Sequence, residues 1–199
     1  MLPIVAGLLV LAALWMAWSG WQRFASGRLD VASGAARTQV AGALQPIVGD
    51  LLDRAGALRG RVALINALRA ADTVAAIAVA KETVPGTEAA EFYSPDFNAG
   101  YANPESFGYG KLGLLERALH EDKAVLAVVK DGGSPRLGIA VPVMFESQVL
   151  RVAYLRLTLG PVLAVAKDAA PSGAYLALRQ GGYTVVESGV IEELKFRAE

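Results

Sequence analysis

Cysteine is absent from the 199-residue chain, and a single histidine, His120, is present. The lack of cysteine excludes disulfide bonds, thiol catalysis and zinc sites with cysteine ligands. One histidine cannot supply a metal site built from several imidazole groups. The 19 basic and 19 acidic side chains give a net charge of zero, whereas surfaces that bind nucleic acid need excess positive charge. We therefore expect no nucleic-acid partner, no metal and no other cofactor.

Charge is also missing from the start of the chain, where the first ionisable side chain is that of Arg23. Residues 2–21 form an uncharged run that would be about 30 Å long as a helix, close to the thickness of the hydrocarbon core of a bilayer. The three tryptophans of the chain lie toward the end of this run, and indole rings favour the membrane interface. We predict a transmembrane signal anchor over 1–22 that contacts the lipid bilayer through 2–21. A cleaved signal peptide and a buried soluble helix are the alternatives.

Residues 35–82 are rich in alanine and predict a helical stalk. Pro46 and several interior glycines argue against one rigid rod, so we expect two or three helices with a break near Gly60. Asp72 is a candidate N-cap for the last of them. Apolar residues recur in steps of four and three, at Leu44, Val48, Leu51, Ala55, Leu58, Val62 and Ile65. This spacing is typical of a coiled-coil seam or of a helix face packed on a core, so both a homodimer and packing on the chain's own domain are open.

Residues 83–189 combine strand and helix patterns and predict one α+β domain, followed by a charged tail over 190–199. Alternating apolar runs predict strands at 87–93, 124–129, 136–144, 149–157, 175–178 and 183–187. Helical periodicity predicts helices at 112–121 and 160–167. The stretch 94–107 is rich in Pro, Asn, Gly and Ser and predicts a loop. Successive strands with helices gathered beside them indicate an antiparallel sheet of about five or six strands with flanking helices.

Aromatic and basic side chains alternate with apolar ones in these strands. In the strand predicted at 149–157, Tyr154 and Arg156 share a face because side chains alternate with a period of two. A sheet that places such groups among apolar neighbours can line a ligand pocket, although a solvated face with scattered apolar residues is the alternative. The candidate ligand-binding residues are Tyr93, Tyr109, Arg136, Tyr154 and Arg156.

The sequence contains no complete catalytic constellation. Gly108, Gly110 and Gly113 spell G-x-G-x-x-G, but no apolar strand leads into the first glycine, as dinucleotide binding requires. We interpret these glycines as shaping a loop that enters a helix. His120 lies at the predicted end of that helix, where it suits the helix dipole better than the role of a general base. We therefore predict no catalytic residue in this chain.

The order of elements resembles the extracytoplasmic Cache/PAS-like sensor domains of bacterial membrane receptors. The long helix after the anchor, RLGIAVPV at 136–143 and VLRVAYLRLTLGPVLA at 149–164 carry this resemblance. The segment GAYLALRQGGYTVVESG at 173–189 also resembles the N-terminal membrane-bound extension of long-form bacterial phosphomannomutase/phosphoglucomutase. The catalytic serine and metal loop of those mutases, of the TASHNP type, have no counterpart in the chain.

The Cache/PAS resemblance implies a non-catalytic, membrane-tethered module that senses or binds an unknown small molecule. The mutase resemblance implies the alternative of an accessory or oligomerisation region for sugar-phosphate metabolism, with the catalytic domain outside this chain. Arg23 and Arg28 follow the apolar run, which by the positive-inside rule favours a cytoplasmic domain. We give more weight to the domain pattern and predict a single-pass protein of the bacterial inner membrane with a periplasmic domain.

Overall fold

The computed structural model describes residues 33–131, 134–171, 177–180 and 183–186. The anchor predicted over 1–22 and the tail predicted over 190–199 therefore lie outside the described residues. Within the described part of the chain, no helix is both long and apolar enough to cross a membrane.

The predicted stalk consists of a long helix and three shorter helical pieces. The long helix runs over 33–56 and continues into η1 (Ala57–Gly60), after which the chain breaks as predicted near Gly60. The helices α2 (Val62–Arg69) and α3 (Thr73–Thr83) follow. The predicted cap of α3 is confirmed, because the Asp72 carboxylate accepts a hydrogen bond of 2.9 Å from the backbone N–H of Ala75.

Pro46 lies inside the long helix and does not end it; the break comes near Gly60, as predicted. A proline removes one hydrogen bond from the helical ladder, and the helix continues where other contacts hold both sides. Leu44 and Ile47 flank Pro46 and pack against the core of the domain. Tertiary packing thus outweighs the local preference of the proline.

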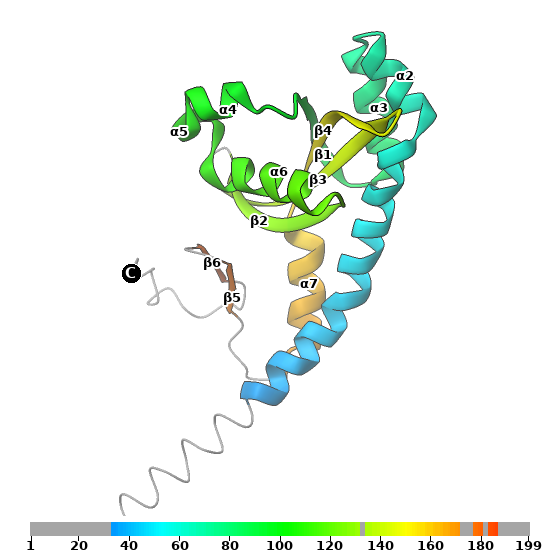
Figure 1. Cartoon of the computed structure of the whole chain (residues 1–199). Coiled ribbons are helices and arrows are strands. Elements are labelled where there is room, and N and C mark those ends of the chain that lie inside the picture. The colour runs from blue at the N-terminus through cyan, green and yellow to red at the C-terminus, as the bar shows by residue number, and fades with distance from the viewer. Residues whose placement is uncertain (1–32, 132–133, 172–176, 181–182, 187–199) are drawn as a thin grey trace, which may run out of the picture.

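Four strands form one antiparallel sheet in the order β1-β4-β3-β2 (Figure 1). They are β1 (Thr87–Tyr93), β2 (Val125–Asp131), β3 (Ser134–Phe145) and β4 (Gln148–Leu157), close to their predicted bounds. Glu146 and Ser147 form the two-residue turn between β3 and β4, with φ values of 48° and 66°. Positive φ at both turn positions matches the right-handed twist of the paired strands.

The sheet is smaller than the predicted five or six strands. The predicted second hairpin exists as β5 (Ala177–Gln180) and β6 (Tyr183–Val186), but in the described residues these strands pair only with each other. The helix α7 (Gly160–Ala169) follows β4 and carries the chain away from the four-stranded sheet before β5 begins (Figure 1). An alternating pattern predicts a strand from local sequence alone, so it does not reveal which sheet the strand joins.

Two short helices replace the loop predicted at 94–107. They are α4 (Asn98–Ala102) and α5 (Pro104–Phe107), and α6 (Tyr109–Glu121) begins three residues earlier than predicted. Pro104 stands in the first turn of α5, and the Asn103 side chain accepts a hydrogen bond of 3.3 Å from the Ser106 N–H. Pro, Asn and Ser favour helix N-termini as well as loops, which explains why composition suggested a loop.

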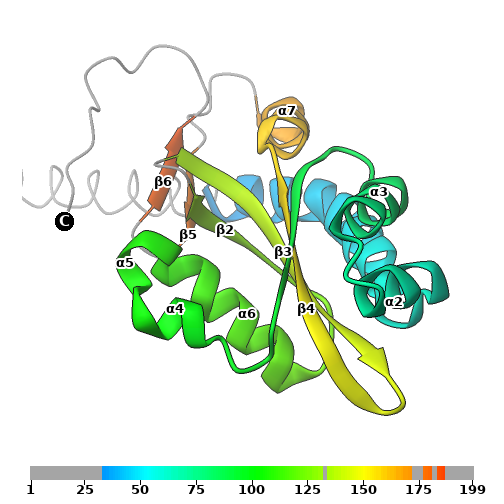
Figure 2. The same ribbon diagram turned by 90° about the horizontal axis from the view of Figure 1, so that it is seen from above.

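Helices cover both faces of the sheet (Figure 2). On one face, η1, α2, α3 and α7 share a core with the aliphatic residues of β3 and β4. On the other face, α6 packs over a second core that includes Val129, Ala140 and Val152. The predicted alternation of β4 is confirmed, because Leu155 belongs to the first core and Tyr154 to the second.

Much of the predicted stalk seam packs on this first core. The contributing seam residues are Leu44, Leu51, Ala55, Leu58 and Ile65. Val62, in contrast, is 69% exposed. The helical stretch therefore contributes to the core of the domain, while a homodimer through the stalk stays a prediction.

One ion pair joins the helical layers on opposite sides of the sheet. Arg59 of η1 donates to the Asp122 carboxylate over 2.6 Å and also to the Asp122 backbone carbonyl. Asp122 follows the last residue of α6 and has a φ of 49°. The carboxylate holds the pKa of Arg59 above its usual value, mainly through this hydrogen bond. The long helix and α6 are thus linked directly at the end of the sheet.

Candidate ligand-binding site

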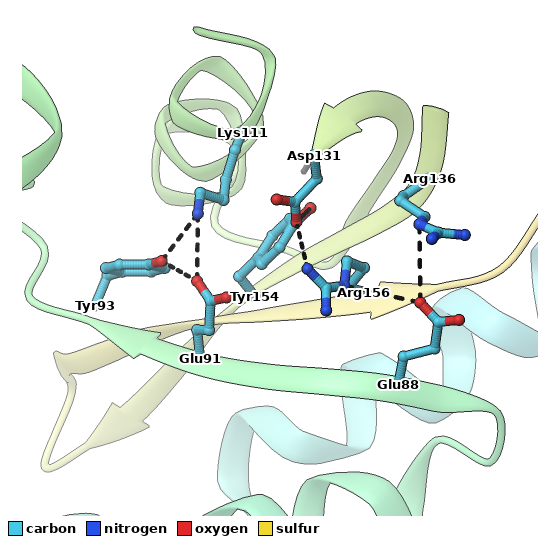
Figure 3. A network of polar contacts seen from close by, with 8 residues as sticks. All are labelled: Glu88, Glu91, Tyr93, Lys111, Asp131, Arg136, Tyr154 and Arg156. Atoms are coloured by element: carbon cyan, nitrogen blue, oxygen red, sulfur yellow. Dashed lines mark hydrogen bonds and ion pairs between the residues drawn. The ribbon is translucent and has the colours of Figure 1, made fainter. Parts of the chain in front are cut away.

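Eight polar side chains gather on the face of the sheet that meets α6 (Figure 3). We call this set the polar cluster; it comprises Glu88, Glu91, Tyr93, Lys111, Asp131, Arg136, Tyr154 and Arg156. The strands supply seven of these residues and α6 supplies Lys111. The cluster holds three acidic and three basic side chains, so its charges balance.

A bulge in β1 brings two glutamates to the same face. The pairing register of β1 with β4 shifts between Thr87 and Ala89, and such an extra residue changes which side the following side chains take. Glu91 and Tyr93 then point toward α6, while Ala90 and Phe92 pack against the opposite core. In a regular strand, Glu88 would share the face of Ala90 and Phe92. The bulge therefore allows Glu88 and Glu91 to join one cluster.

Lys111 lies at one end of the cluster in an enclosure of aromatic rings. Its side chain is 11% exposed, and its Nζ lies 3.3 Å from Glu91 Oε2 and 3.2 Å from the Tyr93 hydroxyl. The Tyr93 hydroxyl also contacts the Glu91 carboxylate. The ring centroids of Phe107, Tyr154 and Tyr93 lie 4.6, 5.5 and 5.6 Å from Nζ. We call these four neighbours of Lys111 the lysine cage.

Two arginines at the other end of the cluster are only loosely paired. Arg156 Nη1 lies 3.6 Å from Asp131 Oδ2, and Arg156 Nε lies 3.8 Å from Glu88 Oε2. Arg136 Nε lies 3.9 Å from that same Glu88 oxygen. These separations exceed hydrogen-bond distance, and the buried Arg156 Nε has no hydrogen-bond partner among the described residues. Each guanidinium carries five N–H donors, so both can bind a further oxygen-bearing group.

Tyr154 joins the two ends of the cluster and is fully buried. Its hydroxyl donates to Asp131 Oδ2 over 3.1 Å, while its ring faces the Lys111 ammonium. Gly138 on β3 makes room for that ring, because a Cβ added there would lie 3.0 Å from Tyr154, from Leu114 and from Val129. The close approach of sheet, ring and α6 therefore requires glycine at this position.

The two phenols of the cluster, the half-buried Tyr93 and the buried Tyr154, stay protonated near neutral pH. Burial raises the pKa of Tyr93 well above its ordinary value, and the hydrogen bond to Glu91 adds to the effect. Burial also raises the pKa of Tyr154, with a further contribution from the nearby Asp131 carboxylate. Both hydroxyls therefore act as hydrogen-bond donors to carboxylates, and the cluster gains no extra negative charge from them.

The structure brings together four of the five candidate residues predicted from sequence. Tyr93, Arg136, Tyr154 and Arg156 all belong to the polar cluster. Tyr109 does not; it is the first residue of α6 and is 66% exposed.

Four members of the cluster were missed by the sequence analysis: Glu88, Glu91, Lys111 and Asp131. Lys111 stands one helical turn before the buried Leu114 and Leu115, a spacing that places it on their face of the helix. Glu91 stands two residues before Tyr93 and so shares its face of the strand. These two spacings are readable from sequence, whereas the bulge that turns Glu88 is not.

The G-x-G-x-x-G segment forms the entry to α6 and not a dinucleotide loop. The short helix α5, and no strand, precedes Gly108, which has a φ of 94°. Gly110 lies against β2, where an added Cβ would be 3.6 Å from Val129. This confirms the interpretation that the glycines shape a loop into a helix. His120 is exposed in the last turn of that helix.

A comparison with known protein families finds no match, and a comparison with curated proteins finds none either. Among solved structures, the sensor domain of the histidine kinase DctB from V. cholerae is similar, with a TM-score of 0.50 and 10% sequence identity. The similarity covers 76% of this chain and 64% of that chain, so the chain spans less than two thirds of that protein's length. At this identity the similarity concerns the fold alone. None of these comparisons supports the resemblance to the phosphomannomutase extension.

Proposed function

We propose that this chain is a membrane-tethered, non-catalytic sensor module that binds a small polar molecule at the polar cluster. The observation that carries the proposal is the set of six charged side chains between the sheet and α6, with two arginines that form no hydrogen bond to its carboxylates. The similarity in fold to a histidine kinase sensor domain supports the same class of function.

Two charged members of the cluster are nearly buried, because the side chains of Lys111 and Asp131 are 11% and 14% exposed. The other four charged side chains are 32–37% exposed. Taking charged groups out of water costs several kcal/mol per ion, and well-packed apolar residues often stabilise a protein as well as a buried ion pair does. The opposite face of the same sheet shows that these strands can build an aliphatic core. The charges toward α6 therefore serve recognition, which loosely paired guanidinium groups suit because they can exchange partners.

A thermal-shift screen of the full chain in detergent tests this proposal. The panel contains small organic acids, amines, amino acids and sugars, each at millimolar concentration. A ligand that binds the native state stabilises it, by about 2.7 kcal/mol at a hundredfold excess over Kd, and therefore raises the melting temperature. We expect at least one compound class to raise it in a saturable way. A flat response across the panel would contradict the proposal.

Site variants then locate the binding. Arg156→Ala removes a cluster member, and we expect it to weaken the affinity of the compound found in the screen by at least tenfold. Arg54→Ala is the matched control, because Arg54 pairs with Asp50 on the long helix, away from the cluster, and its side chain is 48% exposed. Equal ligand shifts in both variants would place the binding elsewhere.

The tether and its direction form the second part of the proposal. The uncharged run at 2–21 supports a retained anchor, and the sensor-type fold supports a periplasmic domain. A reporter that is active only outside the cytoplasm, fused after residue 199, tests the orientation in bacterial cells. Activity of this reporter is expected; an active cytoplasmic reporter at the same position would reverse the predicted topology.

A further inference from the structure

We propose that the ligand of this site carries a primary ammonium group, and that this group binds where the Lys111 ammonium lies in the lysine cage. The inference rests on the proposed sensor function and names the chemical class of its ligand. Lys111 then acts as a tethered occupant of the site, which the ligand replaces.

The cage has the chemistry of an ammonium site. Ring faces attract cations through their quadrupoles within about 6 Å of the centroid, and Nζ of Lys111 lies 4.6 to 5.6 Å from three ring centroids. The Glu91 carboxylate at 3.3 Å supplies the opposite charge, and the Tyr93 hydroxyl at 3.2 Å supplies a hydrogen-bonding oxygen. A primary ammonium from another molecule would meet the same four groups.

Charge balance favours replacement of Lys111 by a cation. When one ammonium leaves the cage and another enters, Glu91 keeps its partner and the charge of the enclosure does not change. An anion in the cage would instead stand beside the carboxylates of Glu91 and Asp131 and would separate Lys111 from Glu91. Like charges at such distances repel strongly in a partly dry site, so the cage selects against anions.

The geometry also allows the exchange. Lysine has a flexible four-carbon stem, and Lys111 stands in the first turn of α6, near the exposed Tyr109 and Gly110. The Glu91 side chain is 37% exposed, so its carboxylate is accessible from solvent while it holds Lys111. A ligand ammonium can therefore reach Glu91 before Lys111 leaves.

Lysine truncation followed by chemical complementation tests the inference. Lys111→Ala removes three methylene groups and the ammonium, which propylammonium replaces in size and charge. The probe is propylammonium chloride, added in the tens of millimolar range to the full chain in detergent. We expect it to raise the melting temperature of Lys111→Ala by about 3 °C, and the wild type by less, because the tethered lysine competes as an intramolecular ligand.

Probes of matched size separate charge from bulk. Propanol and propionate have nearly the same length as propylammonium. Propanol is uncharged, and propionate carries a negative charge. We expect neither to raise the melting temperature of Lys111→Ala. A second substitution, Glu91→Gln in the Lys111→Ala background, keeps the shape of the cage and removes its charge. It should lower the affinity for propylammonium at least fivefold.

Two further variants complete the design. Lys111→Met fills the cage with an uncharged chain, so it should show no shift with propylammonium. Lys123→Ala removes an exposed lysine, 66% exposed and paired with Glu121, and should respond like the wild type. If Lys111→Ala does not fold in plain buffer, its refolding yield becomes the readout; propylammonium should restore the yield and propanol should not.

Each outcome bears on a separate claim. An equal effect of propanol and propylammonium, or no effect of propylammonium on Lys111→Ala, would overturn the ammonium assignment. If an acid or a sugar stabilises the wild type through Arg156 while amines do not, the sensor function stands and the ammonium class is wrong. If no compound of any class binds, the proposed function itself fails.

Discussion

The two faces of the four-stranded sheet use alternate residues of the same strands for different purposes. Toward the long helix, α2, α3 and α7, the core contains fully buried aliphatic side chains such as Ile139, Val141 and Leu155. Toward α6, the neighbouring positions include Tyr154 and Arg156, which belong to the polar cluster. Because a strand sends successive side chains to opposite sides, one segment such as β4 can stabilise the fold on one face and present charges on the other.

The contrast predicts which face tolerates change. Truncating an aliphatic side chain leaves a cavity that a close-packed core fills poorly. Most charged side chains of the polar cluster are 32–37% exposed, so water can replace a partner that a substitution removes. Substitutions in the aliphatic core should therefore lower stability strongly, while those in the polar cluster should chiefly affect ligand binding.

The largest loss of stability should follow Leu155→Ala. Leu155 is fully buried in the aliphatic core, and large-to-small changes at such sites cost about 2–5 kcal/mol. Urea unfolding followed by circular dichroism measures the change through the midpoint. Leu150→Ala, at a partly exposed position of the same strand, is the control and should cost less. A cost under about 1 kcal/mol for Leu155→Ala would contradict the view that this face dominates stability.

Gly138→Ala should show that the α6 face is also closely packed at one point. The added Cβ would lie 3.0 Å from Leu114, Tyr154 and Val129, and overpacking of this kind costs about 1–3 kcal/mol. Gly113→Ala is the matched control, because a Cβ there meets nothing within 4 Å on the exposed side of α6. That change should be neutral or stabilising by up to about 1 kcal/mol. Equal thermal unfolding midpoints for both variants would refute the close contact.

Tyr154→Phe should have a smaller effect on stability. The variant keeps the ring in the lysine cage but loses the hydrogen bond of 3.1 Å to Asp131. A typical hydrogen bond contributes about 1 kcal/mol net, and Arg156 stays near the same carboxylate. Chemical unfolding should therefore show a loss near that value. A loss as large as that of Leu155→Ala would mean that the polar cluster is chiefly structural.

The smallest effect, and a pH-dependent one, should come from Asp122→Asn. The hydrogen bond from Arg59 lowers the pKa of Asp122 below its ordinary value of 3.8, so the folded state favours the ionised carboxylate. Its contribution is then fully present above the unfolded pKa and is lost as pH falls through the lower, folded pKa. The difference in melting temperature between wild type and variant should hold from pH 7 to about pH 5 and shrink as the pH falls further, through the lowered pKa of Asp122 in the folded state. A difference that grows on acidification would contradict this pairing.

The alternation of apolar residues predicted the strands of the main sheet to within a few residues. It did so because one face of each strand must be apolar to meet a core, and that requirement is local to each segment. The number of strands in the sheet was wrong, since β5 and β6 read as strands but pair with each other. Which strands become neighbours depends on contacts distant in sequence, and no local pattern records them.

The candidate site was predicted in part for a similar reason. Tyr154 and Arg156 follow from strand alternation alone, whereas Lys111 was overlooked because the helix was predicted to begin at 112, which left Lys111 in the preceding turn. Only the folded chain shows that its partners are Glu91 and three aromatic rings. Tyr109 was also a candidate, yet its side chain is 66% exposed and lies outside the cluster.

The short connection between β4 and α7 links the polar cluster to a helix on the other face of the sheet. Thr158 and Leu159 alone separate Leu157, the last residue of β4, from the first turn of α7, which runs beside the long helix (Figure 1). A shift of Arg156 along β4 would therefore be expected to displace the start of α7, because so short a connection leaves little freedom between the two elements. The strand that bears part of the site therefore continues, after a two-residue connection, into a helix that packs in the core on the opposite face of the sheet.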